Sequence, residues 1–365
     1  MAERVVVAMS GGVDSAVAAA LLQAQGYEVI GITMKLWDGP AGPAAVKICC
    51  TLDDVSDARR VAARLGIPFF VVNFKAQFAA HVVDPFVAAY RQGATPIPCT
   101  LCNRYLKFTA LRQRAQQLGA RWIATGHYAG IQRGGDGRYY VQRGIDRAKD
   151  QSYFLFNLTQ EQLAQTLFPL ASYRKSDVRA LARQLGLNVA DKRESQEICF
   201  IPEGDYRAFL RARLQPAAYA PGPIVDRHGR YLGQHQGLPF YTVGQRRGLG
   251  IAAPRPLYVT AIDTARNALV VGPREEAMHA AFEVEGVNWM CSPPQQPLHT
   301  CVQIRYRHPP VAATVYPQAG ECALVVLEEP QFAVTPGQAA VFYAGDTVLG
   351  GGWIRRPADP TPRGG

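Results

Sequence analysis

The residues of this chain whose types suit chemistry best form one short run near its start. Two glycines let the backbone turn sharply, so that several N–H groups can converge on an anion at the start of a helix. Two serines can add hydroxyl donors, and an aspartate can position a magnesium ion or hold the shape of the loop. The run is Ser10-Gly11-Gly12-Val13-Asp14-Ser15. It predicts a phosphate-binding loop.

The flanking residues predict a strand before this run and a helix after it. Residues 5–9 are typical of a buried parallel strand, and residues 16–22 of a helix that Gly26 ends. The commonest phosphate loop ends in Gly-Lys-Ser or Gly-Lys-Thr, and this chain contains neither tripeptide. A loop without that lysine suits an ATP that is cut between its α and β phosphates. The run resembles the pyrophosphate loop of ATP pyrophosphatases, which are adenylating enzymes; a plain strand-to-helix turn is the alternative.

Cysteines in two places are candidates for reactive thiols. Cys99 and Cys102 lie at the start of a predicted basic helix, where the helix dipole and the nearby Arg104 and Lys107 favour the thiolate. Cys199 lies in a segment that predicts a strand end or a loop. Adenylation together with paired thiols suggests sulfur transfer, in which ATP activates an oxygen and a persulfide sulfur displaces it.

Other interpretations of the cysteines stay open. A structural zinc half-site would need a fourth ligand and usually a second Cys-x-x-Cys, which the sequence lacks. A redox pair of thioredoxin type would not need an ATP site. The remaining cysteines are expected to be buried and inert. They are Cys49, Cys50, Cys291, Cys301 and Cys322.

Length and charge set limits on the protein and its partners. The 365 residues predict two or three domains. Since the first apolar segment is a five-residue strand, we expect no signal peptide or membrane span and a cytoplasmic protein with reduced cysteines. The net charge of +10 predicts a polyanionic partner. Arginine carries most of it, which suits RNA, although a bias toward arginine codons would have the same effect.

The first two hundred residues alternate between strand and helix patterns. Strands are expected at 28–33, at 67–74 as a buried strand, and at 122–125; helices are expected at 53–65, 79–92, 101–118, 176–186 and 205–214. The alternation predicts a doubly wound parallel sheet, an α/β fold. Together with the loop at 10–15 it resembles the adenine-nucleotide α-hydrolase type. Ligands of such sheets bind at the carboxyl ends of the strands. The phosphate loop and the pair Gly126-His127 both fall at such ends.

Beyond residue 214 the pattern changes to short alternating runs joined by turn residues and prolines. Pro221-Gly222-Pro223 marks a linker, and Cys291-Ser292-Pro293-Pro294 marks a second break. We therefore expect an α/β catalytic domain at 1–214 and a central small β domain at 215–280. A barrel-like β domain is expected at 281–357, with a disordered tail at 358–365.

The chain as a whole resembles the tRNA-specific 2-thiouridylase family, which thiolates the wobble uridine of certain tRNAs. The pyrophosphate loop is shared by a whole superfamily, whereas the later segments are more specific. The segments that carry the resemblance are 8–15, Cys102-Asn103, 125–128, 149–154, 195–200, 242–248 and Arg305-Tyr306.

The resemblance implies a tRNA-uridine 2-sulfurtransferase that uses ATP and Mg²⁺. It would act as a monomer on the anticodon region, with sulfur from a cysteine desulfurase or a relay protein. Cys102 would be the nucleophile and Cys199 the persulfide carrier, and a disulfide between them would be left for reduction. The implied ATP-binding residues are Ala8, Met9, Ser10, Gly11, Gly12, Val13, Asp14, Ser15, Met34 and Gly126. The implied tRNA-binding residues are Ile97, Pro98, Cys99, His127, Lys149, Asp150, Gln151, Arg305, Tyr306 and Gln338.

One position departs from the family pattern. Many members have Asp three residues before the nucleophilic cysteine, with Asn-Pro ahead of it, whereas this chain has Pro96-Ile97-Pro98-Cys99. Cys99, Cys102 and Cys199 could therefore hold a [4Fe–4S] cluster with one iron open for sulfide. Alternatively Cys99 is a resolving thiol beside the persulfide route, which is the interpretation we favour.

Two other functional classes are kept as alternatives. An amide-forming adenylating ligase would need a glutaminase domain or an amino-acid site, and it would not need Cys102 and Cys199. A non-enzymatic tRNA-binding protein could keep a decayed nucleotide loop, but the intact run at 10–15 argues against decay.

Overall fold

The computed structural model describes residues 2–37, 52–193, 198–201 and 204–358. Cys49, Cys50, the segment Ser195-Gln196-Glu197 and the tail from 359 lie outside the described residues. The chain forms two compact units, each described by itself below. The first contains Met1–Val82, Pro98–Asp205 and Asp346–Val348, and the second contains Val83–Ile97, Tyr206–Gly345 and Leu349–Gly365.

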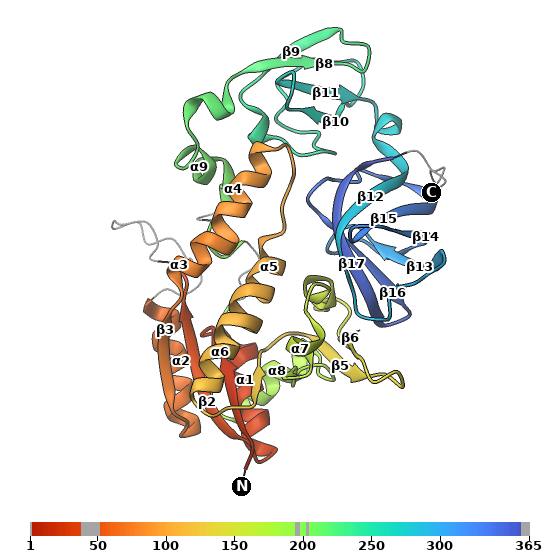
Figure 1. The fold of residues 1–365 in the computed structure, drawn as a ribbon. Helices are drawn as coiled ribbons and strands as arrows, with labels where there is room; N and C mark the ends of the chain where they lie inside the picture. The colour runs from red at the N-terminus through yellow and green to blue at the C-terminus, as the bar shows by residue number, and fades with distance from the viewer. Residues whose placement is uncertain (1, 38–51, 194–197, 202–203, 359–365) are drawn as a thin grey trace. The chain divides into compact units, whose positions relative to one another are not determined.

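The first unit is built on a five-stranded parallel sheet with the strand order β3-β2-β1-β4-β7. Figure 1 labels its strands β2 and β3. The chain runs outward from β1 through β2 to β3 and then returns to the other side of β1 as β4. The β1–β4 pair is therefore the point where the strand order reverses, which is where ligands bind in such sheets. The strands are β1 (Arg4–Ala8), β2 (Glu28–Lys35), β3 (Phe69–Asn73), β4 (Trp122–Ala124) and β7 (Thr166–Leu167). The predicted fold class is confirmed.

Helices cover the central strand of this sheet. Val5, Val6 and Val7 of β1 are fully buried although their side chains alternate between the two faces, so both faces are covered. Helix α1 contacts both α2 and α8, while α6 contacts β1 and β4. The helices are α1 (Val13–Ala24), α2 (Leu52–Leu65), α6 (Leu111–Gln117) and α8 (Lys175–Gln184). Those predicted at 53–65 and 176–186 are confirmed as α2 and α8.

The strand predicted at 67–74 is present as β3, but the prediction that it is buried is wrong. Phe70 is 45% exposed and Val71 is 41% exposed. The reason is position in the sheet, because β3 stands at one end of the strand order and pairs with β2 alone among the strands that the structure describes. An apolar run does not reveal whether its strand lies at the centre or at the edge.

The two long helices predicted at 79–92 and 101–118 each contain a π-helical stretch. The first consists of α3 (Lys75–Phe78), a π-helix at Ala79–Val83 and α4 (Asp84–Arg91). The second consists of α5 (Pro98–Leu101), a π-helix at Cys102–Ala110 and α6. π-Helical stretches often occur at functional sites, and the second one begins at a candidate nucleophile. Cys99 lies inside this helical segment, since it begins at Pro98.

The remaining elements of the first unit are a short hairpin and a short helix. An antiparallel hairpin is formed by β5 (Ala129–Arg133) and β6 (Tyr139–Arg143). Helix α7 (Gln160–Leu163) begins with a capping box in which Thr159 and Gln162 bond each other's backbone N–H.

No helix in the described part of the chain is long and apolar enough to cross a membrane.

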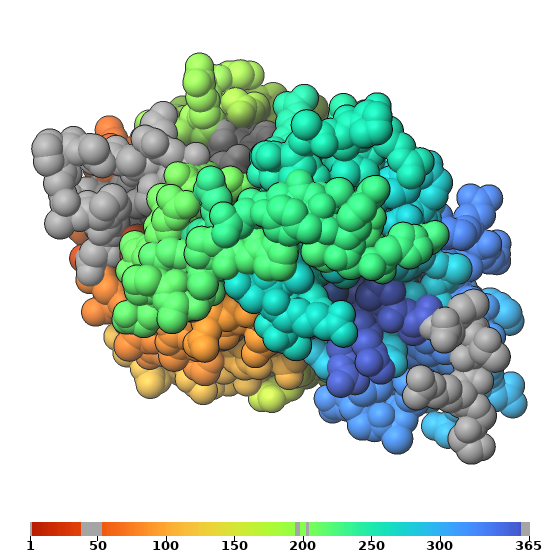
Figure 2. All heavy atoms as spheres, turned by 90° about the horizontal axis from the view of Figure 1, so that it is seen from above, coloured from red at the N-terminus to blue at the C-terminus, as the bar shows by residue number. Residues whose placement is uncertain are grey.

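The second unit is mainly β-structure, apart from α4 and α9 (Tyr206–Arg211). A four-stranded sheet has the strand order β10-β11-β8-β9. Its β8–β9 hairpin lies on the surface that Figure 2 shows in green. Tyr231, on this hairpin, is 66% exposed. The strands are β8 (Gly222–Val225), β9 (Tyr231–His235), β10 (Tyr258–Asp263) and β11 (Ala268–Gly272).

A barrel follows in the same unit, which confirms the barrel-like prediction for the end of the chain. Its strands follow the order β12-β15-β14-β13-β16-β17, and β17 pairs back with β12 to close it. Closure pairs the two outer strands of these six with each other, and alternate side chains fill the interior. The strands are β12 (Met278–Trp289), β13 (Leu298–Gln303), β14 (Val311–Gln318), β15 (Cys322–Phe332), β16 (Ala339–Ala344) and β17 (Thr347–Pro357).

We expect the barrel interior and the β3 edge to respond differently to truncation. Phe282 is fully buried in the barrel core, so Phe282→Ala should lower the free energy of unfolding by about 3–5 kcal/mol. Phe70→Ala removes the same atoms from an exposed position and should lower the free energy of unfolding by less than about 1 kcal/mol. Denaturant unfolding of both variants measures this, and equal losses would contradict the assignment of β3 to an exposed edge.

Candidate active site

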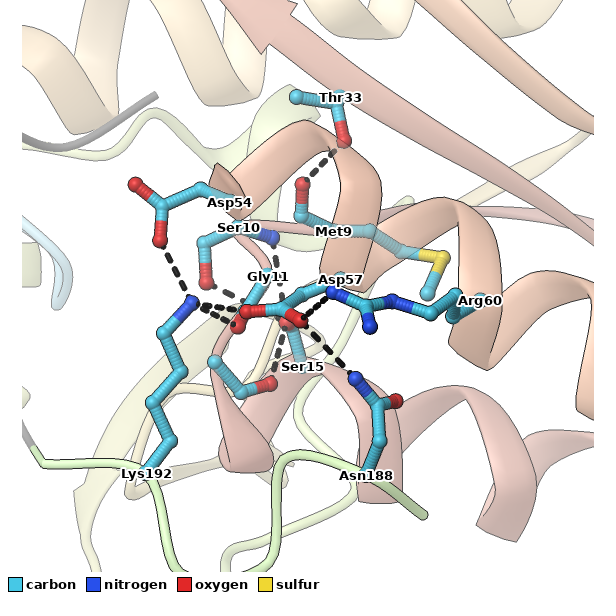
Figure 3. A network of polar contacts seen from close by, with 11 residues as sticks. Met9, Ser10, Gly11, Ser15, Thr33, Asp54, Asp57, Arg60, Asn188 and Lys192 are labelled. Carbon is cyan, nitrogen blue, oxygen red and sulfur yellow. Dashed lines mark hydrogen bonds and ion pairs between the residues drawn. The ribbon is translucent and has the colours of Figure 1, made fainter. Parts of the chain in front are cut away.

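Backbone and hydroxyl contacts shape the loop between β1 and α1 (Figure 3). The Ser10 N–H donates to Oγ of Ser15 over 3.1 Å, and the Ser15 hydroxyl donates to the Gly12 carbonyl over 3.1 Å. The Thr33 hydroxyl on β2 donates to the Met9 carbonyl over 2.7 Å. The 12-residue helix α1 begins at once after the loop, and no side chain caps its N-terminus. Its first N–H groups can therefore receive an anion.

Two glycines allow the ends of β1 and β4 to meet at the loop. Gly11 has a φ of +72°, and a Cβ there would overlap the backbone carbonyl of Asp54 on α2. A Cβ on Gly126, after β4, would lie 2.7 Å from the carbonyl carbon of Asp14 and from the backbone nitrogen of Ser15. The two sequence motifs predicted at strand ends thus come together where the strand order reverses.

Asp14 is held by an ion pair and a hydroxyl group. Nζ of Lys175, at the start of α8, lies 2.7 and 2.8 Å from its two carboxylate oxygens, and the Tyr128 hydroxyl donates to it over 2.7 Å. The Lys175 side chain is only 11% exposed. Of the two roles predicted for Asp14, positioning Mg²⁺ and holding the shape of the loop, this arrangement suits the second.

The described residues do not fit a protein-bound metal. Both oxygens of Asp14 face an ammonium group rather than an open position for Mg²⁺. Within the described ranges, no three Cys, His, Asp or Glu side chains are grouped closely enough to hold a metal ion. Cys99, Cys102 and Cys199 are therefore not arranged as a set of cluster ligands.

Lys192 lies on the other side of the loop and bonds three oxygen atoms (Figure 3). Its Nζ donates to the Gly11 carbonyl over 3.0 Å, to Oδ1 of Asp54 over 2.7 Å and to Oδ2 of Asp57 over 2.5 Å. Burial alone would lower the pKa of Lys192, but the hydrogen bonds and charges of the two carboxylates outweigh it and raise that pKa. Asn188 donates to the other oxygen of Asp57 over 2.9 Å.

A polar chain runs from His127, after β4, to the helix that carries Cys102. The His127 ring has Nδ1 2.6 Å from the Thr125 hydroxyl and Nε2 3.5 Å from Nζ of Lys107. Lys107 donates to Oδ1 of Asn103 over 2.9 Å. Burial, and then the charge of Lys107, hold the pKa of His127 well below 6.5, so the ring is neutral. Since the ring is 7% exposed, its direct contact with tRNA stays a prediction.

The candidate cysteines differ in exposure. Cys99 is exposed, Cys102 is buried and Cys199 is half-buried. Cys199 lies in a turn, as the sequence predicted. The next residue, Phe200, is 1% exposed and packs edge-on against the ring of Phe78 at 5.4 Å between centroids, which anchors this turn in the core.

The prediction that Cys291, Cys301 and Cys322 are buried is wrong. Cys301 is exposed, and Cys291 and Cys322 are half-buried. Cys301 lies on β13, where exposure alternates along the first four residues, and its side chain points away from the barrel interior. A cysteine in a strand pattern does not reveal which face it occupies.

Other candidate residues are occupied by structural contacts. The buried carboxylate of Asp150 pairs with Arg143 at 2.9 Å and accepts the N–H of Gly144 and the hydroxyl of Ser152. Oε1 of Gln151 accepts the Tyr128 N–H over 3.1 Å. Asp150 thus fixes the loop that follows Lys149 in the chain.

The remaining candidates lie in both units. Met34 of β2 is buried, as are Ile97 of the second unit and Pro98 of the first. In the second unit Gln338 donates to the Thr95 carbonyl over 2.8 Å, and Arg305 and Tyr306 are half-buried. Their contacts with tRNA stay predictions.

No short motif in the sequence marks the lysines and acids that brace the loop. Lys175 and Lys192 lie 161 and 181 residues after the positions they contact, and no local pattern joins them to the loop. The scarcity of lysine is one signal in the sequence that could have pointed to these residues, because only seven of the 39 basic residues are lysines. Three of the seven lie at this site: Lys107, Lys175 and Lys192.

The two glycines give a direct test of the loop geometry. Gly11→Ala and Gly126→Ala should each weaken ATP binding about tenfold or more, because strain of roughly 1–3 kcal/mol would displace the loop. Gly135→Ala is the matched control, since a Cβ at Gly135 meets nothing within 4 Å. Calorimetric titration with ATP measures the three affinities. A Gly11→Ala variant that binds ATP like the parent would show that the loop is not the nucleotide site.

The buried neutral His127 predicts a pH effect on stability. Because its pKa is lower in the folded than in the unfolded protein, the unfolded chain binds one more proton below pH 6.5, and stability falls as the pH falls. His127→Gln should therefore reduce the slope of the unfolding free energy between pH 6.5 and 5 by up to about 1.4 kcal/mol per pH unit. Denaturant unfolding across this range measures the difference; an unchanged slope would mean that folding does not lower the pKa of His127.

Comparisons with known proteins cover nearly the whole chain. Residues 3–203 match the model of the tRNA methyl transferase HUP domain, residues 207–273 that of the PRC-barrel domain and residues 279–354 that of the aminomethyltransferase beta-barrel domain. The chain is 54% identical over 356 residues to the tRNA-specific 2-thiouridylase MnmA of Geobacter metallireducens, covering 96% of each chain. It is 52% identical over 354 residues to the protein of that name from Chloroflexus aurantiacus, covering 97% of this chain and 98% of the relative. The chain belongs to the tRNA-specific 2-thiouridylase family.

Proposed function

We propose that this chain replaces the 2-oxygen of the wobble uridine in tRNA by sulfur, at the expense of ATP. The observation that carries the proposal is an intact pyrophosphate loop at the strand reversal of a unit that also carries Cys102 and Cys199. The relatives named above, which match along nearly their full length, support the same substrate. We expect the protein to act as a monomer in the cytoplasm.

The first step is adenylation of the uridine. The Mg²⁺ complex of ATP is the substrate, and the loop N–H groups and the positive end of α1 bind the β and γ phosphates. The uridine is flipped out of the anticodon stack, so that its 2-oxygen can reach the α-phosphate. That oxygen attacks the α-phosphorus, the bond to the β-phosphate oxygen breaks, and pyrophosphate leaves. The poor leaving group on C2 is thereby converted to AMP.

The second step delivers sulfur from Cys199. A cysteine desulfurase or a relay protein loads Cys199 as a persulfide. In one route the Cys102 thiolate attacks Sγ of Cys199, which releases hydrosulfide and leaves a Cys102–Cys199 disulfide. Hydrosulfide then attacks C2, and AMP leaves. In the other route the Cys102 thiolate attacks C2 and AMP leaves, and the terminal sulfur of the Cys199 persulfide then attacks C2 and expels the Cys102 thiolate. That thiolate attacks Sγ of Cys199, so the S–S bond breaks, the sulfur stays on C2, and the same Cys102–Cys199 disulfide is left. A cellular thiol reductant supplies two electrons to the disulfide before the next cycle.

The tRNA is recognised mainly through phosphate and base stacking. The net charge of +10 and the dominance of arginine support an electrostatic contribution. We assign tRNA contacts to Lys149, Gln151, Arg305, Tyr306 and Gln338. Asp150 contributes by holding the loop beside Lys149, since its carboxylate is already bonded within the protein.

The thiols provide the decisive test of this proposal. Cys102→Ser and Cys199→Ser should each abolish thiolation, because one removes the nucleophile and the other the sulfur carrier, while the binding of ATP and tRNA stays within about threefold of the parent. Mass spectrometry of nucleosides from tRNA incubated with ATP, cysteine and a desulfurase measures 2-thiouridine. Cys291→Ser and Cys322→Ser are the controls and should keep the parent activity.

Two outcomes would contradict the assignment. Full activity of Cys199→Ser would remove the persulfide carrier. Stoichiometric iron after anaerobic purification, with turnover that requires it, would make a [4Fe–4S] cluster on Cys99, Cys102 and Cys199 the sulfur carrier instead. The persulfide route predicts that Cys99→Ser is impaired but active.

A further inference from the structure

One segment of the second unit carries most of the net positive charge of the chain. Residues 206–262 contain eight arginines and a single carboxylate, Asp226, so their formal net charge is +7, against +10 for the whole chain. The segment runs from α9 through the β8–β9 hairpin into β10, and Figure 2 shows it in green and turquoise on the surface. A charge excess of this size in one small region attracts a polyanion.

The carboxylates near this segment are already paired with other arginines. Asp226 pairs with Arg230 at 3.2 Å, and Glu276 of the following 3₁₀ turn pairs with Arg227 at 3.4 Å. Three further arginines of the segment are exposed and pair with no carboxylate in the described part of the chain. They are Arg246, Arg247 and Arg255. Their charges are therefore available to a partner.

The loop that carries two of these arginines has a fixed backbone. It belongs to the stretch 242–248, which is one of the segments that carry the family resemblance. The side-chain amide of Gln245 donates to the Arg247 carbonyl over 2.8 Å, and the Val259 N–H on β10 donates to the Gln245 carbonyl over 2.9 Å. The guanidinium groups of Arg246 and Arg247 therefore stand on a preorganised loop, which lowers the cost of ordering it when a partner binds.

The same loop forms a hollow that only cationic side chains and uncharged residues line. Its volume is about 380 Å³, and Arg246 and Arg255 both line it. The other lining residues lie between positions 248 and 257 and carry no charge. A hollow lined by a single sign of charge, with apolar walls, focuses the electrostatic field and attracts the opposite charge. It therefore suits an anionic group of the partner.

Helix α9 adds two more arginines, one of them beside the loop. The guanidinium of Arg207 lies 5.8 Å from the centre of the Tyr241 ring, and its Nη2 atom would be 3.8 Å from a Cβ on Gly248. The guanidinium of Arg211, one helical turn later, lies 4.8 Å from the centre of the Phe240 ring. Contacts with aromatic rings orient these guanidinium groups without neutralising them. Arg207 and the loop thus belong to one surface.

The composition of this surface favours RNA over an acidic protein as the partner. A protein interface normally has an apolar centre with charged residues at its rim. Among the described residues, none of the large hydrophobic side chains that are exposed lies in α9 or at 244–257. Arginine forks, in contrast, match the oxygens of a phosphate and bind them in bidentate fashion.

We propose that these five arginines form a surface that binds the phosphate backbone of tRNA. This arginine surface consists of Arg207, Arg211, Arg246, Arg247 and Arg255. The inference rests on the proposed function, because it takes tRNA to be the substrate. It adds a contact region in the central β domain, to which no tRNA-binding residue has been assigned above. Since a phosphate contact far from the reacting atoms is the same before and during the reaction, the surface contributes to binding and not to the chemical step.

The test measures the affinity of the full chain for tRNA at several salt concentrations. In Arg246→Ala and in Arg255→Ala the slope of log K against log salt should become less steep by roughly 0.7–0.9, the value of one phosphate contact. At about 0.15 M salt this change corresponds to a loss of affinity of about fivefold. The variant that combines Arg246→Ala, Arg247→Ala and Arg255→Ala should lose roughly two to three units of slope.

Arg230→Ala is the matched control for charge. It removes one exposed arginine from the same segment and changes the net charge by the same amount, but this arginine is paired with Asp226. It should therefore keep the parent slope to within about 0.3 units, well below one phosphate contact. A slope that falls equally in Arg230→Ala would mean that net charge alone, and not the arginine surface, sets the affinity.

Kinetics give a second measurement on the same variants. With tRNA, ATP, cysteine and a desulfurase, Arg246→Ala should raise KM for tRNA by about the factor lost in affinity and leave kcat unchanged, because the lost contact is equal in the ground and transition states. KM for ATP should not change. A fall in kcat with unchanged KM for tRNA would contradict a role in binding.

Two outcomes would overturn the arginine surface. One is a parent slope and a parent affinity for tRNA in the triple variant. The other is a triple variant that binds tRNA like the parent but is loaded with sulfur more slowly by the desulfurase, because the surface would then take an acidic protein. The proposed function is judged separately on the parent protein. A parent that binds tRNA but forms no 2-thiouridine would reject that function, while the slopes still decide whether the arginine surface binds RNA.

Discussion

The sharp turn at Gly11 is the constraint on which the rest of the site depends. The chain leaves β1 at the point where the strand order reverses and must enter α1 within a few residues. It does so with Gly11 at positive φ against the backbone of Asp54, in a space that no side chain could share. The N–H groups at the start of α1 are then turned toward the carboxyl end of the sheet, where a phosphate can reach them.

The lysines of the site brace this turn, and the backbone is left to receive the anion. Lys175 is neutralised by Asp14, and Lys192 is balanced by Asp54 and Asp57. Withdrawing an ammonium from water is costly unless its donors are matched, and both lysines are matched by carboxylate oxygens. An ATP molecule would therefore meet N–H donors and a helix terminus whose geometry is already fixed. Such preorganisation avoids the cost of ordering the loop when the nucleotide binds.

What could be predicted from the sequence was mostly local. The loop at 10–15, its strand and its helix follow from residues that are close in sequence, because turn chemistry and hydrophobic period act over that range. Two kinds of error came from long-range properties. The burial of β3 depended on its place in the sheet, and the exposure of Cys301 depended on which face of its strand formed the barrel interior. Neither is encoded in a window of ten residues.

The lysine content of the chain carries information that the motifs do not. A bias toward arginine codons and an affinity for RNA both explain why arginine outnumbers lysine in the chain. Neither explains why Lys175 and Lys192, two of only seven lysines, both bond the loop at 10–15. At Lys192 one compact ammonium meets three oxygen atoms within 3.0 Å, an arrangement that suits lysine better than the planar fork of arginine. In an arginine-rich protein, the positions that retain lysine therefore mark places where the direction of the donors decides the fit, and these are good starting points for finding a site that no short motif reveals.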